Sequence, residues 1–358
     1  MDKRIDSVFV AALRQVAPGS PLRAGLDRIV QARMGALVVL GDSAEVLAIC
    51  SGGFLVDAEF SPQRLYELAK MDGAIVLSRD GSRIARANVH LVPDPRVPTS
   101  ETGTRHRTAE RVARSIDVPV VALSEELAVI TVYRGDYKRQ LRSIPAVLSR
   151  ADQALSTLER YKERLDSVMS TLNSLELRHE AKFKDVLLVL QRAEMVRRIS
   201  DEIEWYLIEL GDDGRLLALQ LDELSLDIRG DYESVVTDFL GPCTEVDVRR
   251  IMDFLGSLTT EQLLDTKLIA QGVSSLTSCA DLVGITSPSE SLQASIRSKG
   301  KRILAQVPHI PVDVQDRILS RFSSLEELMN VSEFDLARVD GVGDNWARAI
   351  KEWLVAEA

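Results

Sequence analysis

Short apolar stretches recur through the first 140 residues, and each is bounded by turn residues or polar positions. Their length, β-branched content and flanks are typical of strands. The predicted strands are residues 36–40, 74–78, 82–91, 118–123 and 127–133. A helix is predicted to begin at Ser61, because serine is a favourable N-cap and Pro62 fits the first helical turn. Strands and helices mixed in this way predict an N-terminal α/β domain over residues 1–143, with a mixed sheet flanked by helices.

The pattern changes after residue 143, where proline and glycine nearly vanish as far as about Ile208. Apolar residues recur there at spacings of three and four, which is typical of one face of a long helix. They are Leu155, Leu158, Tyr161, Leu165, Val168, Met169, Leu172 and Leu175. This pattern predicts an all-α helical spine over residues 144–288. For the first helix alone, a coiled-coil arm that dimerises is the alternative.

The last segment, residues 289–358, consists of short predicted helices separated by turns. It contains a weak internal repeat with an offset of 32 residues, in which residues 307–311 align with residues 339–343. Each copy has a turn, an apolar residue, a second turn and a helix. This segment is therefore predicted to be a small all-α domain, and the whole chain to be a multidomain protein.

The formal net charge of -10, taken as a whole, argues against a polyanionic partner such as DNA. Its distribution changes that conclusion. Residues 1–140 carry 19 basic and 17 acidic side chains, residues 141–290 carry 16 and 27, and residues 291–358 carry 9 and 10. The acidity thus belongs to the predicted spine, and the bulk charge does not decide what either flanking segment binds.

The apolar runs, the N-terminal residues and the cysteines bear on the cellular location of the protein. No apolar run approaches the ~18 residues that a membrane helix needs, and the N-terminus has no apolar signal core. Cys50, Cys243 and Cys279 are scattered and form no CxxC pair, so neither a disulfide framework nor a zinc knuckle is expected. These features predict a cytoplasmic protein with no membrane partner.

Three basic side chains, Arg105, His106 and Arg107, fall in the first turn of a predicted helix. A helix N-terminus carries a partial positive charge, so each cation there is unfavourable by roughly 0.3–1 kcal/mol unless an anion is bound. Free backbone amides, guanidinium groups and the hydroxyls of Thr104 and Thr108 together indicate a polyphosphate site. Thr102 or Thr104 is expected to cap this helix, with Gly103 permitting the turn before it. The alternative is a solvated basic turn paired with surface carboxylates.

Asp72-Gly73-Ala74 lies between a predicted helix and a predicted strand. Asp72 is a candidate metal ligand or acceptor for a sugar hydroxyl, and Gly73 would allow a ligand to approach the backbone closely. The alternative is that Asp-Gly simply ends the helix and forms the turn.

Ser124-Glu125-Glu126 directly follows a predicted strand. Carboxylates at the C-terminal end of a strand in an open α/β sheet lie where ligands usually bind. An ordinary polar turn is the alternative.

Taken in this order, residues 72–74, 103–107 and 124–126 resemble the diadenylate cyclase domain of bacteria. The strand beginning at residues 35–39 and the pair Gly52-Gly53 match that domain as well. Together with the helical spine and the C-terminal segment, the resemblance extends over essentially the whole chain, to the bacterial diadenylate cyclases that scan DNA integrity.

The resemblance implies condensation of two ATP molecules into cyclic di-AMP and two pyrophosphates, with Mg²⁺ or Mn²⁺ as cofactor. It also implies a homo-octamer in which cyclase domains meet face to face. Its implied catalytic residues are Asp72, Arg105, His106 and Arg107, with Asp72 and Glu125 at the metal. Its implied ATP-binding residues are Gly73, Ala74, Leu91, Thr104, Arg105, His106, Arg107, Thr108 and Ser124.

The C-terminal sequence Asp340-Gly341-Val342-Gly343 resembles the hairpin of a helix-hairpin-helix DNA-binding motif. In that motif backbone amides meet DNA phosphates, so contact is not sequence-specific. The resemblance also implies that the DNA can be branched. The implied DNA contacts are Gly341, Val342, Gly343, Asn345 and Arg348. The sequence departs from the motif at Asp344, and the first copy has His309 and Pro311, which cannot donate an amide. The alternative is a small packing domain without DNA affinity.

The leading hypothesis is therefore a diadenylate cyclase whose DNA-contacting tail regulates its output. A nucleotide-sensing, DNA-binding scaffold without cyclase turnover is the principal alternative, and an oligomerisation spine with degenerate ends is a third. The carboxylate of Asp72 discriminates between the first two, since a sensor needs the basic cluster but not Asp72.

Overall fold

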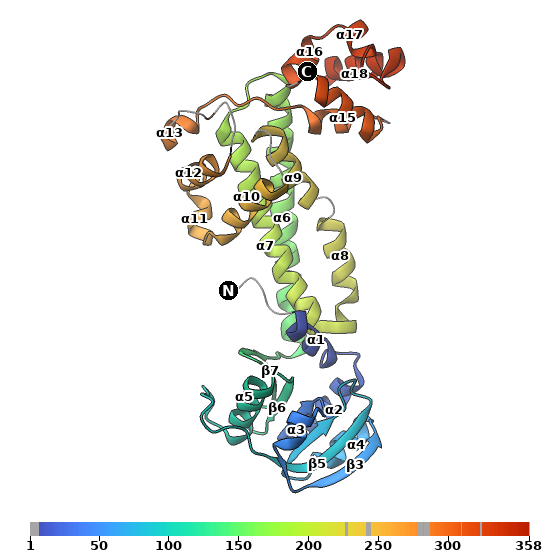
Figure 1. Ribbon diagram of the computed structural model, residues 1–358, viewed down its shortest axis with the longest axis vertical. Coiled ribbons are helices and arrows are strands. Elements are labelled where there is room, and N and C mark those ends of the chain that lie inside the picture. Colours follow the sequence, from blue (N-terminus) through green and yellow to red (C-terminus); the bar gives the residue numbers. More distant parts are fainter. Residues whose placement is uncertain are drawn as a thin grey trace. The chain divides into compact units, whose positions relative to one another are not determined.

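The computed structural model of the chain describes residues 7–225, 228–240, 245–277, 282, 287–308, 310–322 and 324–357. The chain divides into two compact units, which are coloured along the sequence in Figure 1. Unit 1 comprises Met1–Ala154 and Glu202–Gln220, and unit 2 comprises Leu155–Asp201 and Leu221–Ala358. This division follows packing and passes through two long helices, whereas the boundaries predicted at residues 143 and 288 follow changes in sequence pattern.

Unit 1 is built on an eight-stranded sheet with the order β2-β5-β4-β1-β6-β7-β8, in which β3 also pairs with β5. The strands are β1 (Ala36–Leu40), β2 (Cys50–Ser51), β3 (Phe54–Glu59), β4 (Ala74–Leu77), β5 (Arg83–Leu91), β6 (Val120–Ser124), β7 (Val129–Arg134) and β8 (Tyr137–Gln140). β1 and β4 are parallel, and the other pairs are antiparallel. The five predicted strands are confirmed to within two residues at each end; the sequence pattern did not indicate β2, β3 or β8.

The central strands are buried on both faces, because successive side chains point into two different apolar layers. On β1, Ala36, Val38 and Leu40 belong to one cluster, and Leu37 and Val39 belong to the other. Helices supplying the first cluster are α1 (Ser7–Gln15), α2 (Pro21–Gln31) and α4 (Pro62–Leu68), and those supplying the second are α3 (Ala44–Ala48) and α5 (Thr104–Ile116). This two-sided burial explains why the strand sequences read as continuous apolar runs.

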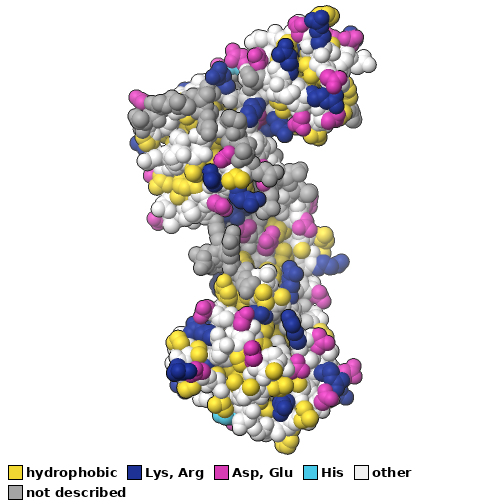
Figure 2. Space-filling model, in the orientation of Figure 1, with side chains coloured by type: hydrophobic (Ala, Val, Ile, Leu, Met, Phe, Trp, Pro, Cys, Tyr) yellow, Lys and Arg dark blue, Asp and Glu magenta, His cyan; other side chains and the backbone are white. Residues whose placement is uncertain are grey.

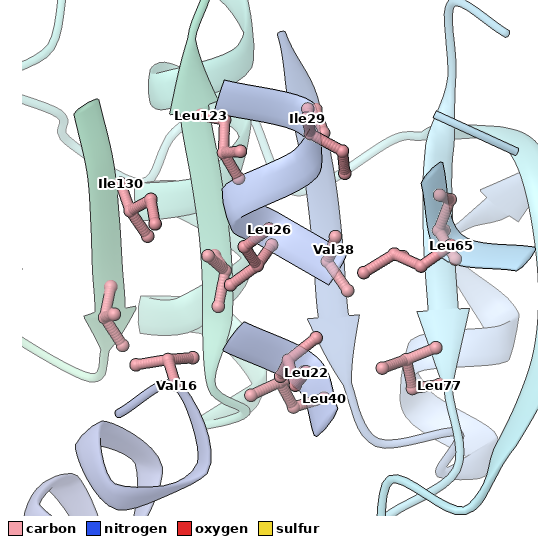
Figure 3. Close-up of a cluster of buried hydrophobic side chains, with 14 of the residues drawn as sticks. Val16, Leu22, Leu26, Ile29, Val38, Leu40, Leu65, Leu77, Leu123 and Ile130 are labelled. Atoms are coloured by element: carbon pink, nitrogen blue, oxygen red, sulfur yellow. The ribbon is translucent and has the colours of Figure 1, made fainter. Parts of the chain in front are cut away.

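Figure 3 shows the first cluster, where Leu22, Leu26 and Ile29 of α2 lie against Val38 and Leu40 of β1. Helix α4, which contributes the buried Leu65, begins where the sequence predicts. Ser61 is its N-cap, and the hydroxyl of Ser61 accepts a hydrogen bond from the backbone amide of Arg64 at 3.2 Å.

Residues 202–220 also belong to unit 1. They form the end of α7 (Phe183–Leu210), then η1 (Gly211–Gly214) and the start of α8 (Arg215–Ser225). Trp205 and Ile208 pack against the first cluster, and Arg139 of β8 forms an ion pair with the buried Glu209.

Unit 2 is all-α over the described residues, apart from an isolated bridge between Lys182 and Ser295. The predicted long amphipathic helix is confirmed as α6 (Ile144–Leu177), on which Leu158, Leu165 and Leu172 are buried. The helices that follow α8 are α9 (Ile228–Phe239), α10 (Glu245–Ser257), α11 (Thr260–Leu264), α12 (Thr266–Leu276), α13 (Pro288–Ser291), α14 (Lys301–Gln306), α15 (Val312–Arg321), α16 (Leu325–Asn330), α17 (Glu333–Ala337) and α18 (Gly343–Glu357). Within the described ranges, none of the helices has both the length and the apolar character needed to cross a bilayer.

The internal repeat predicted for the C-terminal segment corresponds to two helix pairs, α14–α15 and α17–α18. Ile318 on α15 and Ile350 on α18 occupy equivalent places, and both are fully buried in one shared core. The predicted fold class is thus confirmed: an α/β unit precedes a helical spine and a small helical C-terminal region.

Arg302 is a buried arginine that joins α14 to α6 and α9 inside unit 2. Its guanidinium donates to Glu176 at 3.1 Å and also bonds Asn173, while its backbone amide donates to Asp238 at 3.0 Å. Burial raises the pKa of Glu176 and of Asp238; the Asp238 charge adds to the increase at Glu176, and Arg302 opposes it. Arg302 is therefore the cation that allows two carboxyl groups to be buried close together.

Replacing Arg302 with alanine is expected to destabilise unit 2 by about 3–5 kcal/mol, because the substitution leaves the buried carboxyl groups without their cation. The measurement is denaturant unfolding followed by the fluorescence of Trp346 and Trp353, which pack against the C-terminal core, in a Trp205→Phe background. Arg321→Ala, which removes an exposed arginine at the end of α15, is the matched control. Equal unfolding midpoints for the two variants would contradict the structural role assigned to Arg302.

Candidate active site

Three loops of unit 1 meet at one edge of the sheet. Because β1 and β4 are parallel, Gly35 before β1 and Asp72 before β4 lie at the same edge. Because β6 is antiparallel to β1, with Ala36 opposite Leu123, Glu125 after β6 lies at that edge as well. Glu125 therefore lies at the C-terminal end of its own strand, as expected, and this edge is the amino end of the parallel pair β1 and β4.

Helix α5 begins at Thr104, and its N-cap is Gly103, which supplies no side-chain hydrogen bond. The expected caps, Thr102 or Thr104, are therefore wrong, because the helix starts one residue too early for Thr104 and one too late for Thr102. Gly103 has ordinary backbone angles (φ -77, ψ 142), so it is not needed for a left-handed turn. Its contribution is the absence of a capping oxygen, which leaves the first amides of α5 available to an anion.

The loop that leads into α5 is fastened to the helix itself. The buried carboxylate of Glu110 accepts a hydrogen bond from the amide of Ser100 at 2.9 Å and another from the hydroxyl of Thr99. Arg111 donates to the carbonyl of Val97 at 3.0 Å. Burial alone would raise the pKa of Glu110, but the bonds from Thr99 and Ser100 outweigh it and lower the pKa. The start of α5 is consequently held in a defined place.

Arg105 lies between two carboxylates from different loops. Its Nη2 is 3.0 Å from Oδ1 of Asp72, and its Nη1 is 3.8 Å from Oε2 of Glu125. Its guanidinium also lies against the Cα of Gly35, where an added Cβ would come within 2.1 Å of Nη1. The side chain of Asp72 is 94% exposed, so its carboxylate is held at the protein surface and is open to solvent.

Gly73 has a packing role in the structure. A Cβ at this position would lie 2.6 Å from the backbone of Asn88 on β5. Ala74 and Leu91, at the ends of β4 and β5 respectively, are both buried in the second apolar cluster. The structure thus gives Gly73 a close contact with β5 and places the side chains of Ala74 and Leu91 in the apolar interior.

His106 takes part in a chain of polar side chains behind the start of α5. Its Nδ1 is 2.9 Å from the hydroxyl of Tyr133, which donates to Oε1 of Glu101 at 2.8 Å. Lys138 of β8 forms an ion pair with the same carboxylate. Burial lowers the pKa of His106; the Glu101 charge opposes this, and Lys138 and Arg105 reinforce it. The resemblance pointed to His106, whereas Glu101, Tyr133 and Lys138 were missed.

Other predicted residues lie around the same helix start. The side chain of Arg107 is exposed, and that of Thr108 is half-buried. Ser124 accepts a hydrogen bond from the amide of Leu127 at 3.2 Å, so its hydroxyl stabilises the turn after β6. The structure thus gathers Asp72, Arg105 and Glu125 directly.

Metal binding here would depend on few protein ligands. Among the described residues there is no cluster of three or more His, Cys, Asp or Glu side chains able to hold a metal ion. Asp72 and Glu125 contribute two carboxylates on either side of Arg105. Two hard oxygen donors near the uncapped start of α5 suit Mg²⁺ or Mn²⁺, whose remaining ligands are usually phosphate and water.

The predicted DNA contacts cluster at the start of α18. Gly341 and Gly343 have left-handed backbone angles (φ 79 and 63), and a Cβ on Gly343 would meet no atom within 4 Å. Val342 differs, because its side chain is buried and its amide donates to the carbonyl of Val339 at 3.0 Å. We therefore remove Val342 from the set of DNA contacts.

Asn345 is exposed on α18, and Arg348 forms an exposed ion pair with Glu333 at 3.3 Å. In the first copy of the repeat, Pro311 is the N-cap of α15, and His309 lies outside the described residues. Figure 2 shows basic and acidic side chains interspersed on the visible face of the C-terminal helices, at the top of the view. On that face charge alone does not mark a DNA-binding patch.

Comparisons with known proteins cover nearly the whole chain. The family profile described as "DisA bacterial checkpoint controller nucleotide-binding" matches residues 23–137, and "DisA bacterial checkpoint controller linker region" matches residues 141–278. The DNA integrity scanning protein DisA of Parafrankia sp. is 47% identical over 350 residues, covering 98% of this chain and 95% of the relative. The protein of the same name from Carboxydothermus hydrogenoformans is 42% identical over 351 residues, covering 98% and 96%.

Among solved structures, a double mutant of DacA from Staphylococcus aureus is 24% identical to the part it matches. The match covers 38% of this chain and 91% of that chain, with a TM-score of 0.28.

A methyl group added at Gly73 and one added at Gly35 are expected to have different effects on the stability of unit 1. Gly73→Ala should cost about 1–3 kcal/mol, because the new Cβ meets the rigid backbone of Asn88. Gly35→Ala should leave stability nearly unchanged, because it meets only the mobile end of Arg105. Thermal unfolding followed by circular dichroism measures both, and an equal loss in the two variants would contradict this account.

Proposed function

Because the chain belongs to the DNA integrity scanning protein DisA family, we propose that it is a diadenylate cyclase that condenses two ATP molecules into cyclic di-AMP and two pyrophosphates. The observation that carries the proposal is the pairing of exposed Asp72 with Arg105 at the uncapped start of α5. A simple phosphate sensor would need the arginine and the amides, but not a solvent-facing carboxylate beside them.

The reaction consists of two equivalent steps. In each, the 3′-hydroxyl oxygen of one ATP forms a bond to the α-phosphorus of the other. The bond from that phosphorus to the bridging oxygen breaks, pyrophosphate leaves, and the hydroxyl proton passes to a base or to solvent. One site per protomer holds one ATP, so the second ATP must come from a facing protomer, as an isologous two-fold contact provides. The homo-octamer implied by the resemblance belongs to this proposal.

The basic groups at the start of α5 and the carboxylate of Asp72 have different roles in this reaction. Arg105 and Arg107 bind the triphosphate and offset the charge that develops on the departing pyrophosphate. The first amides of α5, with the hydroxyls of Thr104 and Thr108, donate to phosphate oxygens. Asp72 is exposed at the edge where the facing nucleotide would arrive, so it can orient or deprotonate the attacking hydroxyl.

A divalent cation fits this site. Mg²⁺ or Mn²⁺, when bound with the nucleotide, would supply Lewis-acid polarisation of the phosphate oxygens. Asp72 and Glu125 would hold it. Because both carboxylates lie beside Arg105, binding of the triphosphate would replace these ion pairs with contacts to phosphate and metal.

We also propose that the C-terminal helices bind the DNA backbone without reading sequence. The support is the open backbone at Gly343, the first residue of α18, where a Cβ would meet no atom within 4 Å. Asn345 and Arg348 are exposed on the first turns of the same helix. At Gly341, by contrast, a Cβ would lie 2.2 Å from Nη1 of Arg317. Backbone amides at a helix start can meet phosphate without a basic surface. Regulation of the cyclase by DNA, including branched DNA, follows as part of this proposal.

Incubation of the full chain with ATP and Mg²⁺ or Mn²⁺ is expected to yield cyclic di-AMP, detected by mass spectrometry, and no product without the metal. Asp72→Asn should lower product formation by at least about 100-fold, because the amide can neither bind the metal well nor accept a proton. Asp57→Asn is the matched control, since Asp57 also forms an exposed pair with an arginine, Arg83, at 2.7 Å. ATP binding without any product would favour the nucleotide-sensing scaffold.

Electrophoretic shift assays at low salt are expected to show binding to linear and branched DNA that weakens as salt rises. Arg348→Ala should reduce the slope of log affinity against log salt by about 1, because one phosphate contact is lost. Arg178→Ala, which removes an exposed arginine outside the C-terminal helices, should leave the slope unchanged. Absence of a shift on either DNA at low salt would instead support a packing domain.

A further inference from the structure

We propose that Tyr133 is a positioning residue that fixes the tautomer of His106, so that Nδ1 carries a proton and Nε2 is the atom presented to the nucleotide. The tautomer is inferred from the hydrogen bonds around Tyr133 and does not depend on the proposed function. Its consequence for turnover rests on the proposed cyclase function.

The direction of each hydrogen bond settles the protonation of the imidazole. Tyr133 has one hydroxyl proton, and Glu101 accepts it at 2.8 Å. Glu101 is ionised, because its pKa is lowered: burial would raise it, but the bonds from Lys138 and Tyr133 outweigh burial. The tyrosine oxygen can therefore only accept from His106, whose Nδ1 lies 2.9 Å away and must be the N–H.

Tyr133 is rigidly placed. It is 1% exposed and belongs to the apolar cluster under α5, so its ring cannot turn away from His106. The two rings meet edge to face, with centroids 6.2 Å apart. Burial and the Glu101 charge raise the pKa of Tyr133 far above neutrality, so the hydroxyl proton is always present. Because the hydroxyl of Tyr133 is fixed in place and donates its proton to Glu101, it selects the His106 tautomer that carries a proton on Nδ1.

The other edge of the imidazole lies toward the start of α5. A Cβ placed on Gly103 would be 3.9 Å from Cδ2 of His106, and Nε2 is bonded to Cδ2. Nε2 is the next ring atom after Cδ2, so this edge of the imidazole is the one nearer to Gly103, the N-cap of α5. Of the three basic side chains in the cluster, His106 alone can offer either a lone pair or, after taking up a proton, an N–H.

Tyr133 differs in this from an ordinary buried tyrosine. Its hydroxyl bonds two ionisable residues from the segment that enters α5, Glu101 before the helix and His106 in its first turn. The orientation of the His106 ring is therefore fixed by residues of β7 and β8, through the linked side chains of Tyr133, Glu101 and Lys138. The arrangement is analogous to the outer-shell groups that orient functional histidines elsewhere.

The tautomer can be read directly by magic-angle-spinning NMR of the full-length protein with ¹⁵N-labelled histidine. His106→Gln identifies the signal of His106 among the four histidines. Protonated Nδ1 is expected in the wild type, and the more usual Nε2–H form in Tyr133→Phe. An Nε2–H tautomer in the wild type would overturn the proposal whether or not any variant folds, and whether or not the protein is a cyclase.

Turnover provides the second readout. Tyr133→Phe is expected to lower kcat for cyclic di-AMP by roughly 10-fold or more with little change in KM for ATP, as loss of an orienting partner does. Tyr66→Phe makes the same chemical change on α4, at the opposite face of the sheet, and should have no effect. Full turnover in Tyr133→Phe would refute this role while leaving the cyclase proposal intact, and a wild type that binds ATP without product would refute only the cyclase proposal.

Discussion

Burial of the central sheet on both faces is the constraint on which the rest of unit 1 depends. Strands β1, β4 and β6 have no solvent face, so helices must cover the sheet on both sides. Helix α5 packs on one of these two sides, against the second apolar cluster. Once α5 lies on the second apolar cluster, its first turn falls at the edge where the loops before β1 and β4 and after β6 meet. The position of Arg105 beside Asp72 and Glu125 is a consequence of packing elsewhere.

The contacts at the site itself contribute little to stability. The pair of Asp72 and Arg105 is exposed, so water and salt screen it strongly. Its value is positional, since it keeps a carboxylate and a guanidinium close together without burying either. The rigid parts lie one layer deeper, where Glu110 holds the entering loop and Tyr133 holds His106. The exposed pair of Asp72 and Arg105 can therefore change partners, while the buried contacts of Glu110 and Tyr133 keep the backbone around it in place.

Unit 2 also combines buried ion pairs with an accessible segment of backbone. Its buried charges, Arg302 with Glu176 and Asp238, join helices that are far apart in sequence. The start of α18 is open by contrast, because a Cβ added to Gly343 would meet no atom of the described residues within 4 Å. Strong buried pairing and an accessible backbone therefore coexist within one small helical region.

Much of the fold and part of the site could be predicted from the sequence. The five buried strands, the start of α4, the long helix α6 and the C-terminal repeat follow from local periodicity and capping, and the ordered patches at Asp72, Arg105 and Glu125 carried the family. The short or exposed strands β2, β3 and β8 lacked an apolar signature. Only the tertiary structure decided which end of the sheet forms the site and that Gly73 packs against the backbone of Asn88. It alone also decided that His106 is hydrogen-bonded to Tyr133, and Tyr133 to Glu101. The reason is that strand direction, strand crossing and hydrogen bonding across 27 to 32 residues depend on pairing between distant segments, which no local pattern contains.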